Sequence, residues 1–472
     1  MPSPPNILVI MSDQHSAAWS GAYGHPFLHT PAIDRLAAEG ATFDNAYCNS
    51  PICAPSRASF MTGRLVSEIA AWDNGTPFGS DQPTWAHTLN AAGYETTLCG
   101  KMHFIGPDQM HGFQRRLLSD VHGNGNPRLI ANWDSPNPSS AAMDRSAFDE
   151  SGPGDSTYQQ YDDAVANRSA AYLAEAARHE RPWALCASFI TPHNPLIVRQ
   201  QYWDQYFPDH ADQPTIAPHK ETLHPHNRGM GDWFDFHDVE PEKMARGRAA
   251  YYGLVTFCDE RIGQVLDALD ASGQSEDTLV IYVSDHGELN GEHGLWNKQS
   301  FYEHSSHIPM IIRWPGHIAA GRRIDQVTSL VDLAATIVDL SGSDPLEGTS
   351  GSSLLPLLRD AAPQCAGSAI SEYFAVGTVT PARMLRNGPH KLHYYHNQPL
   401  ELFDLYSDPD ELTNLADDSA HADVQERLLT KLLTDWDPDD LDRRIRASQR
   451  DRLLIAAGNS VHGIPAWKPG SD

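Results

Sequence analysis

The fold class of this chain is indicated most clearly by Thr278-Leu279-Val280-Ile281-Tyr282-Val283, a run that continues into Ser284-Asp285-His286. A strand with apolar side chains on both faces lies buried between two layers, which is typical of parallel sheets covered by helices. Similar short apolar runs occur at residues 7–11, 183–190 and 310–314. We therefore predict buried strands at these positions, in one mostly parallel sheet.

Stretches with helical spacing lie between these runs, at residues 31–39, 85–92, 161–179 and 245–272. Gly40, Gly93 and Gly273 follow three of them, at positions where glycine commonly ends a helix. This alternation predicts an α/β fold, with a large mixed, mostly parallel sheet sandwiched by helices.

The pattern changes after residue 358. Short strand-like pieces at residues 369–374 and 391–395 lead to Leu402-Phe403-Asp404-Leu405 and predict a small antiparallel sheet. We expect a large α/β domain over residues 1–360 and a small α+β subdomain over residues 361–438. A tail over residues 439–472 is expected to pack against a neighbouring subunit of a homo-oligomer.

Composition limits the partners. The 472 residues include 34 Lys plus Arg against 61 Asp plus Glu, a formal net charge of −27. Such a charge disfavours nucleic acid and favours small substrates over large polyanions. No apolar run is long enough for a membrane span, and six widely spaced cysteines fit a reducing compartment. Since the first residues lack the basic region of a signal peptide, the protein is cytoplasmic or a leader is missing; we expect a cytoplasmic protein.

Two polar pairs directly follow predicted strands. Asp13 and Gln14 come after the first strand, and Asp285 and His286 come after the strand that contains Tyr282. Because the carboxyl ends of parallel strands meet at one edge of a sheet, we expect the pairs to converge. Carboxylates, amide oxygens and imidazoles all bind divalent cations. A single Asp at such a position is usually a turn residue, but two pairs favour a metal site.

Two irregular stretches allow further interpretations. Residues 118–154 are rich in Gly, Asn, Pro and Ser, and predict a long loop that covers the site and sets substrate choice. Residues 210–238 contain five histidines, which we interpret as solvated loop residues and not as metal ligands. They are His210, His219, His224, His226 and His237.

A third motif identifies a nucleophile. The segment Cys53-Ala54-Pro55-Ser56-Arg57, with its continuation Ala58-Ser59-Phe60-Met61-Thr62-Gly63-Arg64, resembles the formylglycine signature of type I sulfatases. Further segments of that family follow in order: Gly93-Tyr94-Glu95-Thr96, Gly100-Lys101-Met102-His103, Thr191-Pro192-His193, Ser284-Asp285-His286-Gly287-Glu288, Lys298, Leu402-Phe403-Asp404-Leu405 and Asn414-Leu415. Over residues 6–416 the chain thus resembles the formylglycine-dependent sulfatases of the alkaline phosphatase superfamily.

The resemblance implies a reaction. In this family the cysteine is oxidised to an aldehyde, formylglycine, whose hydrate attacks a sulfate ester through oxygen. A formylglycine-generating enzyme is therefore an expected partner, acting on Cys53 during maturation. By the same resemblance, Arg57, Lys101 and Lys298 hold the sulfate oxygens.

The resemblance also assigns proton carriers and metal ligands. His193, with Lys298, is the acid that protonates the leaving alkoxide, and His103 is the base. His103 stands two residues after Lys101, a spacing that places both side chains on one face of an extended chain.

The implied metal ligands are Asp13, Gln14, Asp285, His286 and one oxygen of the modified Cys53. Many similar sulfatases have Asp in place of Gln14 and Asn in place of His286. The family therefore predicts Ca²⁺ as the first choice, and the nitrogen ligand makes Mn²⁺ the second.

Within the family, residues 101–113, Glu372-Tyr373 and Ala447-Ser448-Gln449-Arg450 look most like choline sulfatases. A choline site needs aromatic faces and usually an acid. The candidates are Trp72, Trp133, Glu372 and Tyr373, each of which also fits ordinary packing. Val376 stands where that group tends to have an acid, so choline itself stays open.

We therefore predict a sulfuric ester hydrolase that acts on a small alkyl or aryl, or choline-like, sulfate monoester. One alternative is a phosphonate monoester or phosphodiester hydrolase of the same superfamily, which Gln14 and His286 favour. Another is a non-catalytic oxyanion-binding protein in which Cys53 stays unmodified.

Overall fold

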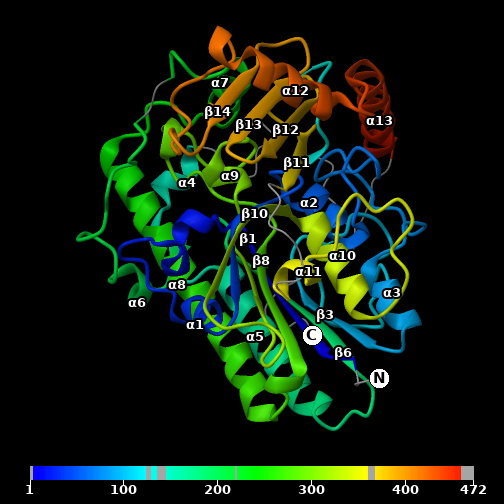
Figure 1. The fold of residues 1–472 in the computed structure, drawn as a ribbon. Coiled ribbons are helices and arrows are strands. Elements are labelled where there is room, and N and C mark those ends of the chain that lie inside the picture. Colours follow the sequence, from blue (N-terminus) through cyan, green and yellow to red (C-terminus); the bar gives the residue numbers. More distant parts are fainter. Residues whose placement is uncertain (1–3, 124–128, 136–144, 218–219, 360–366, 459–472) are drawn as a thin grey trace.

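The computed structural model describes residues 4–123, 129–135, 145–217, 220–359 and 367–458. Its centre is an eight-stranded sheet with the strand order β10-β2-β9-β8-β1-β6-β3-β4 (Figure 1). The strands are β1 (Asn6–Asp13), β2 (Ala41–Tyr47), β3 (Glu95–Gly100), β4 (Arg115–Leu118), β6 (Trp183–Pro192), β8 (Thr278–Ser284), β9 (Met310–Arg313) and β10 (Arg322–Ser329). β9 is antiparallel to its neighbours and the other pairs are parallel, which confirms the predicted mixed, mostly parallel sheet.

The strands β1 and β8 determine where the polar pairs lie. Every residue of both strands is buried. They are adjacent and parallel, with Ser12 opposite Ser284. Asp13 and Asp285 therefore leave the sheet side by side, as the sequence predicted.

Helices cover both faces of the sheet, and Figure 1 shows them on either side. One set is α1 (Pro31–Glu39), α5 (Thr157–Ala176) and α8 (Pro241–Ser272), and the other is α2 (Cys53–Thr62), α3 (Trp85–Ala91) and α10 (Leu330–Leu340). Side chains of β1 alternate between the two layers. Leu8 and Ile10 pack with the first set, whereas Ile7 and Val9 pack with the second. Each face thus has its own apolar core.

Glycines end these helices in different ways. Gly273 follows α8 with φ 75°, a left-handed conformation that glycine adopts without steric cost. Gly40 follows α1 with φ −133°, so it is not a left-handed cap. A Cβ atom at Gly40 would come within 2.5 Å of the carbonyl oxygen of Ile312. Glycine is needed there because β9 passes close to the backbone.

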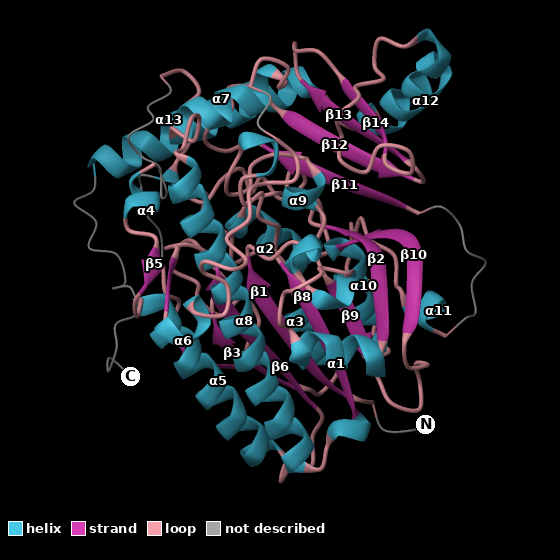
Figure 2. Ribbon diagram, turned by 90° about the vertical axis from the view of Figure 1, so that its left-hand side faces the viewer, coloured by secondary structure: helices cyan, strands magenta, loops and turns pink. Residues whose placement is uncertain are grey.

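The predicted small antiparallel sheet is present at the C-terminal end (Figure 2). It consists of β11 (Ser368–Tyr373), β12 (Ala382–Asn387), β13 (His390–Tyr395) and β14 (Glu401–Asp404), covered by α12 (Ala422–Leu433). Helix α13 (Pro438–Gly458) follows, and the rest of the predicted tail lies outside the described residues. The boundaries at residues 360 and 438 stay predictions.

The shorter elements connect these layers. They are α4 (Ser146–Asp149), α6 (Gln200–Trp203), α7 (Pro225–Phe234), α9 (Glu303–Ser306), α11 (Leu355–Leu358), β5 (Gly152–Pro153), β7 (Ile197–Val198) and the 3-10 turns η1 (Ala17–Trp19), η2 (Gly21–Tyr23), η5 (Ser275–Asp277), η6 (Glu292–Gly294) and η7 (Ser419–His421). Throughout the described residues, no helix combines the length and the apolar character that a membrane span requires.

The interpretation of residues 210–238 as an irregular stretch with solvated histidines is wrong in part. The stretch contains α7, and His224 and His226 are buried. The His224 ring stacks on Tyr395 with centroids 4.1 Å apart. Burial lowers the pKa of His226 to about 3, so its ring is neutral and forms part of the core. His210 is exposed, His237 is half-buried, and His219 lies outside the described residues.

Candidate active site

Cys53 is the first residue of α2, a helix whose ten residues are all buried. Two hydrogen bonds hold the start of this helix in place. The backbone N–H of Ala54 donates to Asn74 Oδ1 at 2.9 Å, and Ser56 Oγ donates to the carbonyl of Asp285 at 2.6 Å. The Cys53 thiol is thereby held at the strand ends. The N-terminus of a helix, with its free N–H groups and dipole, also favours an anion there.

Two carboxylates and two cations lie beneath Cys53. Arg57 Nη2 contacts Asp13 Oδ2 at 2.8 Å, and Arg57 Nε contacts Asp285 Oδ2 at 2.7 Å. Lys101 Nζ contacts the same oxygen of Asp13 at 2.6 Å. All four side chains are fully buried. We name these four residues, Asp13, Arg57, Lys101 and Asp285, the Arg57 cluster.

The positive and negative charges of the Arg57 cluster balance each other. Burial alone opposes ionisation of Asp13, but Lys101 and Arg57 more than offset that cost and hold its pKa well below the usual value. Arg57 Nη1 also donates to Ser188 Oγ at 2.9 Å and to the carbonyl of Lys101 at 2.7 Å. Nearly all hydrogen-bonding capacity of this guanidinium is therefore used by the protein itself.

Four buried groups could hold a metal ion. Donor atoms of Asp13, Cys53, Asp285 and His286 all lie within 4.8 Å of one another. His286 Nδ1 faces the carbonyl of Gly287 at 3.1 Å, so Nδ1 carries a proton, and Nε2 lies 3.1 Å from Cys53 Sγ. Two carboxylates and an imidazole whose Nε2 is turned inward are a donor set that fits a divalent cation. Three members of the two predicted pairs, Asp13, Asp285 and His286, are thus brought together.

Gln14 lies beside this group in a left-handed conformation, with φ 68°. Its side-chain oxygen contacts Lys298 Nζ, and its side-chain nitrogen donates to Glu288 Oε2. The other oxygen of Glu288 accepts the backbone N–H groups of Asn290 and Asn297, each at 2.7 Å. Glu288 therefore orients Gln14. The sequence showed Glu288 within a family motif but assigned it no role.

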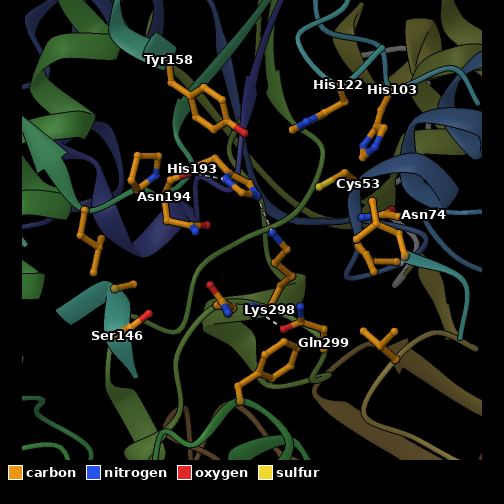
Figure 3. A pocket seen from close by; sticks show the side chains of 18 of the residues that line it. Cys53, Asn74, His103, His122, Ser146, Tyr158, His193, Asn194, Lys298 and Gln299 are labelled. Atoms are coloured by element: carbon orange, nitrogen blue, oxygen red, sulfur yellow. Dashed lines mark hydrogen bonds between the residues drawn. The ribbon is translucent and has the colours of Figure 1, made fainter. Parts of the chain in front are cut away.

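A cavity of about 400 Å³ opens beside Cys53. Figure 3 shows the side chains that border it, with His103 and His122 near Cys53 and with His193 and Lys298 facing them. The polar lining residues are Cys53, Asn74, His103, His122, Ser146, Glu150, Tyr158, His193, Asn194, Asn297, Lys298 and Gln299. Of the predicted catalytic residues, Arg57 and Lys101 are not among the described residues that line this cavity and belong instead to the Arg57 cluster.

His193 and Lys298 form a direct pair. Lys298 Nζ lies 3.0 Å from His193 Nε2, while His193 Nδ1 faces the carbonyl of Asn194 at 2.7 Å. Since a carbonyl only accepts, Nδ1 carries the proton and Nε2 accepts from the ammonium. Burial, followed by the charge of Lys298, holds the pKa of His193 well below its usual value. The proton available in this pair therefore lies on Lys298.

His103 borders the cavity for a reason other than the predicted one. β3 ends at Gly100, and His103 has φ 55°, so Lys101 and His103 do not share a face of an extended strand. The backbone N–H of His103 instead donates to Asp120 Oδ2 at 2.7 Å. Within the described structure both ring nitrogens lack a hydrogen-bond partner, and the ring lies 4.5 Å from that of His122. His122 was missed because it belongs to the predicted loop.

The described parts of the predicted loop, residues 118–154, border the site. The cavity lining includes His122, Leu129, Ser146 and Glu150 from this loop, whereas residues 124–128 and 136–144 lie outside the described residues. The four candidate choline contacts are all buried, and none is among the described residues that line the cavity. These four are Trp72, Trp133, Glu372 and Tyr373.

Comparisons with known proteins agree with this geometry. A family model described as "Sulfatase" matches residues 5–343, and one described as "N-sulphoglucosamine sulphohydrolase, C-terminal" matches residues 291–436. The first match includes the Arg57 cluster, Cys53 and every residue that lines the cavity except Val376.

Similar proteins include a choline-sulfatase of Rhizobium meliloti (strain 1021), 36% identical over 96% of this chain and 90% of the relative. An arylsulfatase of Clostridium perfringens (strain 13 / Type A) is 28% identical over 87% of this chain and 90% of its own length. Among solved structures, a phosphonate monoester hydrolase from Silicibacter pomeroyi superposes with a TM-score of 0.74 at 26% identity. That match covers 90% of this chain and 94% of the hydrolase.

Proposed function

Since this chain belongs to the sulfatase family, we propose that it hydrolyses a small organic sulfate monoester with a formylglycine formed from Cys53. The observation that carries the proposal is the position of the Cys53 thiol. It lies at the start of a buried helix, 3.1 Å from His286 Nε2 and above two carboxylates that Arg57 joins. A formylglycine-generating enzyme would act on the chain before this segment is buried. We also propose a cytoplasmic homo-oligomer.

The metal proposal rests on the donor atoms around Cys53. Asp13, Asp285 and His286, with Gln14 as a fourth ligand, would hold one divalent cation, Ca²⁺ first and Mn²⁺ second. When bound, such an ion supplies positive charge and Lewis acidity at the sulfate. Gln14 reaches the ion if its amide oxygen turns away from Lys298.

The cations have different tasks. Because the hydrogen-bonding capacity of Arg57 is nearly all used by protein groups, we assign it the positioning of the two carboxylates. Lys298 lines the cavity, and Lys101 pairs with Asp13, whose carboxylate lies beside Cys53, so these two supply charge to the sulfate. This refines the expectation that all three bind sulfate directly.

One lysine and one histidine move protons in this proposal. Lys298, hydrogen-bonded to His193 Nε2, donates a proton to the leaving alkoxide, and His193 orients the ammonium. His103 accepts the remaining hydroxyl proton of the nucleophile, since its ring nitrogens border the cavity and have no partner among the described residues. Removal of that proton lets the hydrate expel sulfate without a second attack by water.

The test combines mass and turnover. Protein co-expressed with a formylglycine-generating enzyme should show the aldehyde mass at Cys53 and hydrolyse 4-nitrophenyl sulfate. Cys53→Ala should have no activity while keeping its melting temperature. Cys53→Ser should cleave at most one ester molecule per active site and then stay sulfated, because a side chain with a single hydroxyl cannot expel sulfate. Multiple turnover by Cys53→Ser would contradict the mechanism.

A phosphonate monoester hydrolase is the second candidate, supported by the 26% identical hydrolase and by the Asp13–Gln14 pair. Parallel rate measurements on an aryl sulfate and an aryl phosphonate monoester separate the two. We expect the sulfate to have the higher kcat/KM. An unmodified Cys53 after co-expression, with no turnover of either ester, would instead support an oxyanion-binding protein.

A further inference from the structure

One wall of the cavity is apolar and continuous with a core. Ile52, Leu196 and Phe234 line the cavity and belong to one buried hydrophobic cluster. Ala147 and Val376 also line it and pack against the same cluster. Each of the first three side chains is less than 5% exposed. The hydrophobic cluster holds these side chains in place, so this wall presents only apolar side chains to a ligand.

The charges that border the cavity are unevenly placed. Lys298 and the histidines lie at the end where Cys53 opens (Figure 3). Among the described lining residues Glu150 is the one acid, and its side chain is exposed to solvent. Solvent screens a carboxylate in that position, so its attraction for a cation is weak. Val376, at the apolar wall, offers no charge.

Three of the four candidate choline contacts, Glu372, Trp72 and Trp133, are already occupied by other groups of the protein. Glu372 accepts hydrogen bonds from the backbone N–H and Oγ of Ser67, each at 2.9 Å, and pairs with Arg383 at 3.2 Å. Its carboxylate is therefore neutralised inside the protein.

The two tryptophans are occupied in a similar way. The guanidinium of Arg444 lies 5.5 Å from the ring centroid of Trp72, and that of Arg446 lies 5.5 Å from that of Trp133. These cation–π contacts use faces that a ligand cation would need.

From this arrangement we propose that the substrate is the sulfate ester of a neutral alcohol with an apolar body, such as a branched alkyl group. The proposal rests on the sulfatase function above and concerns the organic half of the ester. An ammonium group placed against the apolar wall would lose its hydration without gaining a buried carboxylate among the described lining residues. A branched alkyl group there instead gains apolar contact. A cavity of about 400 Å³ suits an alcohol of this size.

The decisive comparison uses two esters of the same shape. Choline O-sulfate and 3,3-dimethylbutyl sulfate differ in one atom, a quaternary nitrogen or a quaternary carbon. We expect kcat/KM for the neutral ester to be larger by about tenfold or more. The net charge of −27 attracts cations, so long-range attraction works against this result. Equal values, or a preference for choline O-sulfate, would overturn the proposal.

Matched variants locate the preference. Val376→Glu adds an acid to the apolar wall and should shift the ratio toward choline O-sulfate by about tenfold, whereas Val376→Gln, of equal size, should not. Glu150→Gln should change the ratio less than threefold, because that carboxylate is solvated. If Glu150→Gln instead abolished the difference in kcat/KM between the two esters, Glu150 and not the apolar wall would determine the preference.

A binding measurement separates this proposal from the proposed function. Calorimetric titration of Cys53→Ala, which cannot turn the esters over, should rank the neutral ester above choline O-sulfate. If the modified wild-type protein hydrolyses 4-nitrophenyl sulfate but binds choline O-sulfate more tightly, the sulfatase function stands and the substrate class is wrong. If the neutral ester binds more tightly but the modified protein hydrolyses no sulfate ester, the preference for a neutral alcohol stands and the sulfatase function is wrong.

Discussion

Two of the buried groups of ionisable side chains in the described structure combine carboxyl groups with basic residues. The Arg57 cluster lies at the end of the large sheet. The second group, which we name the Lys391 cluster, joins α9 to the small sheet and consists of Glu303, Lys391, His393, Glu401 and Glu411. In it Lys391 Nζ contacts Glu303 at 2.7 Å and Glu411 at 2.9 Å, and His393 faces Glu401 at 3.1 Å.

The two clusters differ in whether reactive side chains beside them can reach a ligand. Beside the Arg57 cluster, Cys53, His103 and Lys298 border a cavity, and the ring nitrogens of His103 have no partner in the described structure. In the Lys391 cluster the charged groups contact one another across two parts of the chain. Buried charge alone therefore does not identify an active site. What identifies it is reactive atoms turned toward a space that a ligand can enter.

The largest effect is expected for Lys298→Met. The change removes the ammonium that is hydrogen-bonded to His193 Nε2, and with it the proton for the leaving group. We expect kcat for an alkyl sulfate to fall by about 10²–10⁴-fold with little change in melting temperature. An aryl sulfate, whose leaving group needs less protonation, should lose less. Equal losses for both esters would argue against Lys298 as the acid.

The matched variant in the second cluster is Lys391→Met. It leaves Glu303 and Glu411 buried without their cation, which typically costs about 3–5 kcal/mol of unfolding free energy. Chemical denaturation measures this loss. Since no residue of the Lys391 cluster borders the described cavity, kcat per folded, modified molecule should stay within about twofold of the wild type. A large fall in kcat would show that the two clusters are coupled.

The same comparison shows what the sequence could predict. Asp13, Asp285 and Cys53 follow from apolar runs and a dense motif, because the ends of neighbouring parallel strands must meet. His122 and the Lys391 cluster depend on contacts between residues far apart in the chain, which no local pattern records. Glu401, for example, is buried only because β14 pairs with β13.

Strand β12 illustrates a second limit. Its sequence contains Arg383 and Arg386, which argue against a buried strand, yet both side chains are buried. Arg383 pairs with Glu372, and Arg386 donates to the carbonyl of Pro389 at 2.5 Å. The charges are tolerated because partners from neighbouring strands and turns meet them. The prediction therefore found β11, β13 and β14 but not β12.

A smaller effect is expected from Arg452 in α13, which supports the cavity from outside. Its guanidinium contacts both oxygens of Asp73, at 2.5 and 3.1 Å, and Asp73 also accepts the backbone N–H of Ala131 at 3.0 Å. The next residue, Asn74, holds the start of α2 beside Cys53. Arg452→Met should lower kcat/KM by about tenfold, since misplaced catalytic groups react slowly.

The control for this variant lies on the same helix. Arg443 is exposed and pairs with Asp440 within one turn, so Arg443→Met should leave kcat/KM unchanged. If Arg452→Met lowers the melting temperature without affecting kcat/KM, its contact with Asp73 stabilises the fold but does not position the site.

The smallest effect concerns pH and the Lys391 cluster. Burial, together with Glu411, raises the pKa of Glu401 to about 8, and burial raises the pKa of Glu411 to about 7 against the opposing charge of Lys391. In an unfolded chain both groups titrate near about 4.3. The folded protein therefore binds these protons more tightly. Their contribution to stability is complete below about pH 4 and is lost as pH rises through about 7 to 8.

Because this loss of stability with rising pH requires a carboxyl group that ionises, Glu401→Gln tests it: glutamine stays neutral at every pH. Glu401 faces Glu411, Lys391, His393 and Tyr395, and these groups remain in the variant. Between pH 6 and pH 8.5 the melting temperature of the wild type should fall by on the order of 2 °C more than that of Glu401→Gln. Parallel melting curves would show instead that Glu401 is ionised throughout this range. The Lys391 cluster would then carry one more negative charge at neutral pH, and Lys391→Met should prove more damaging than predicted above.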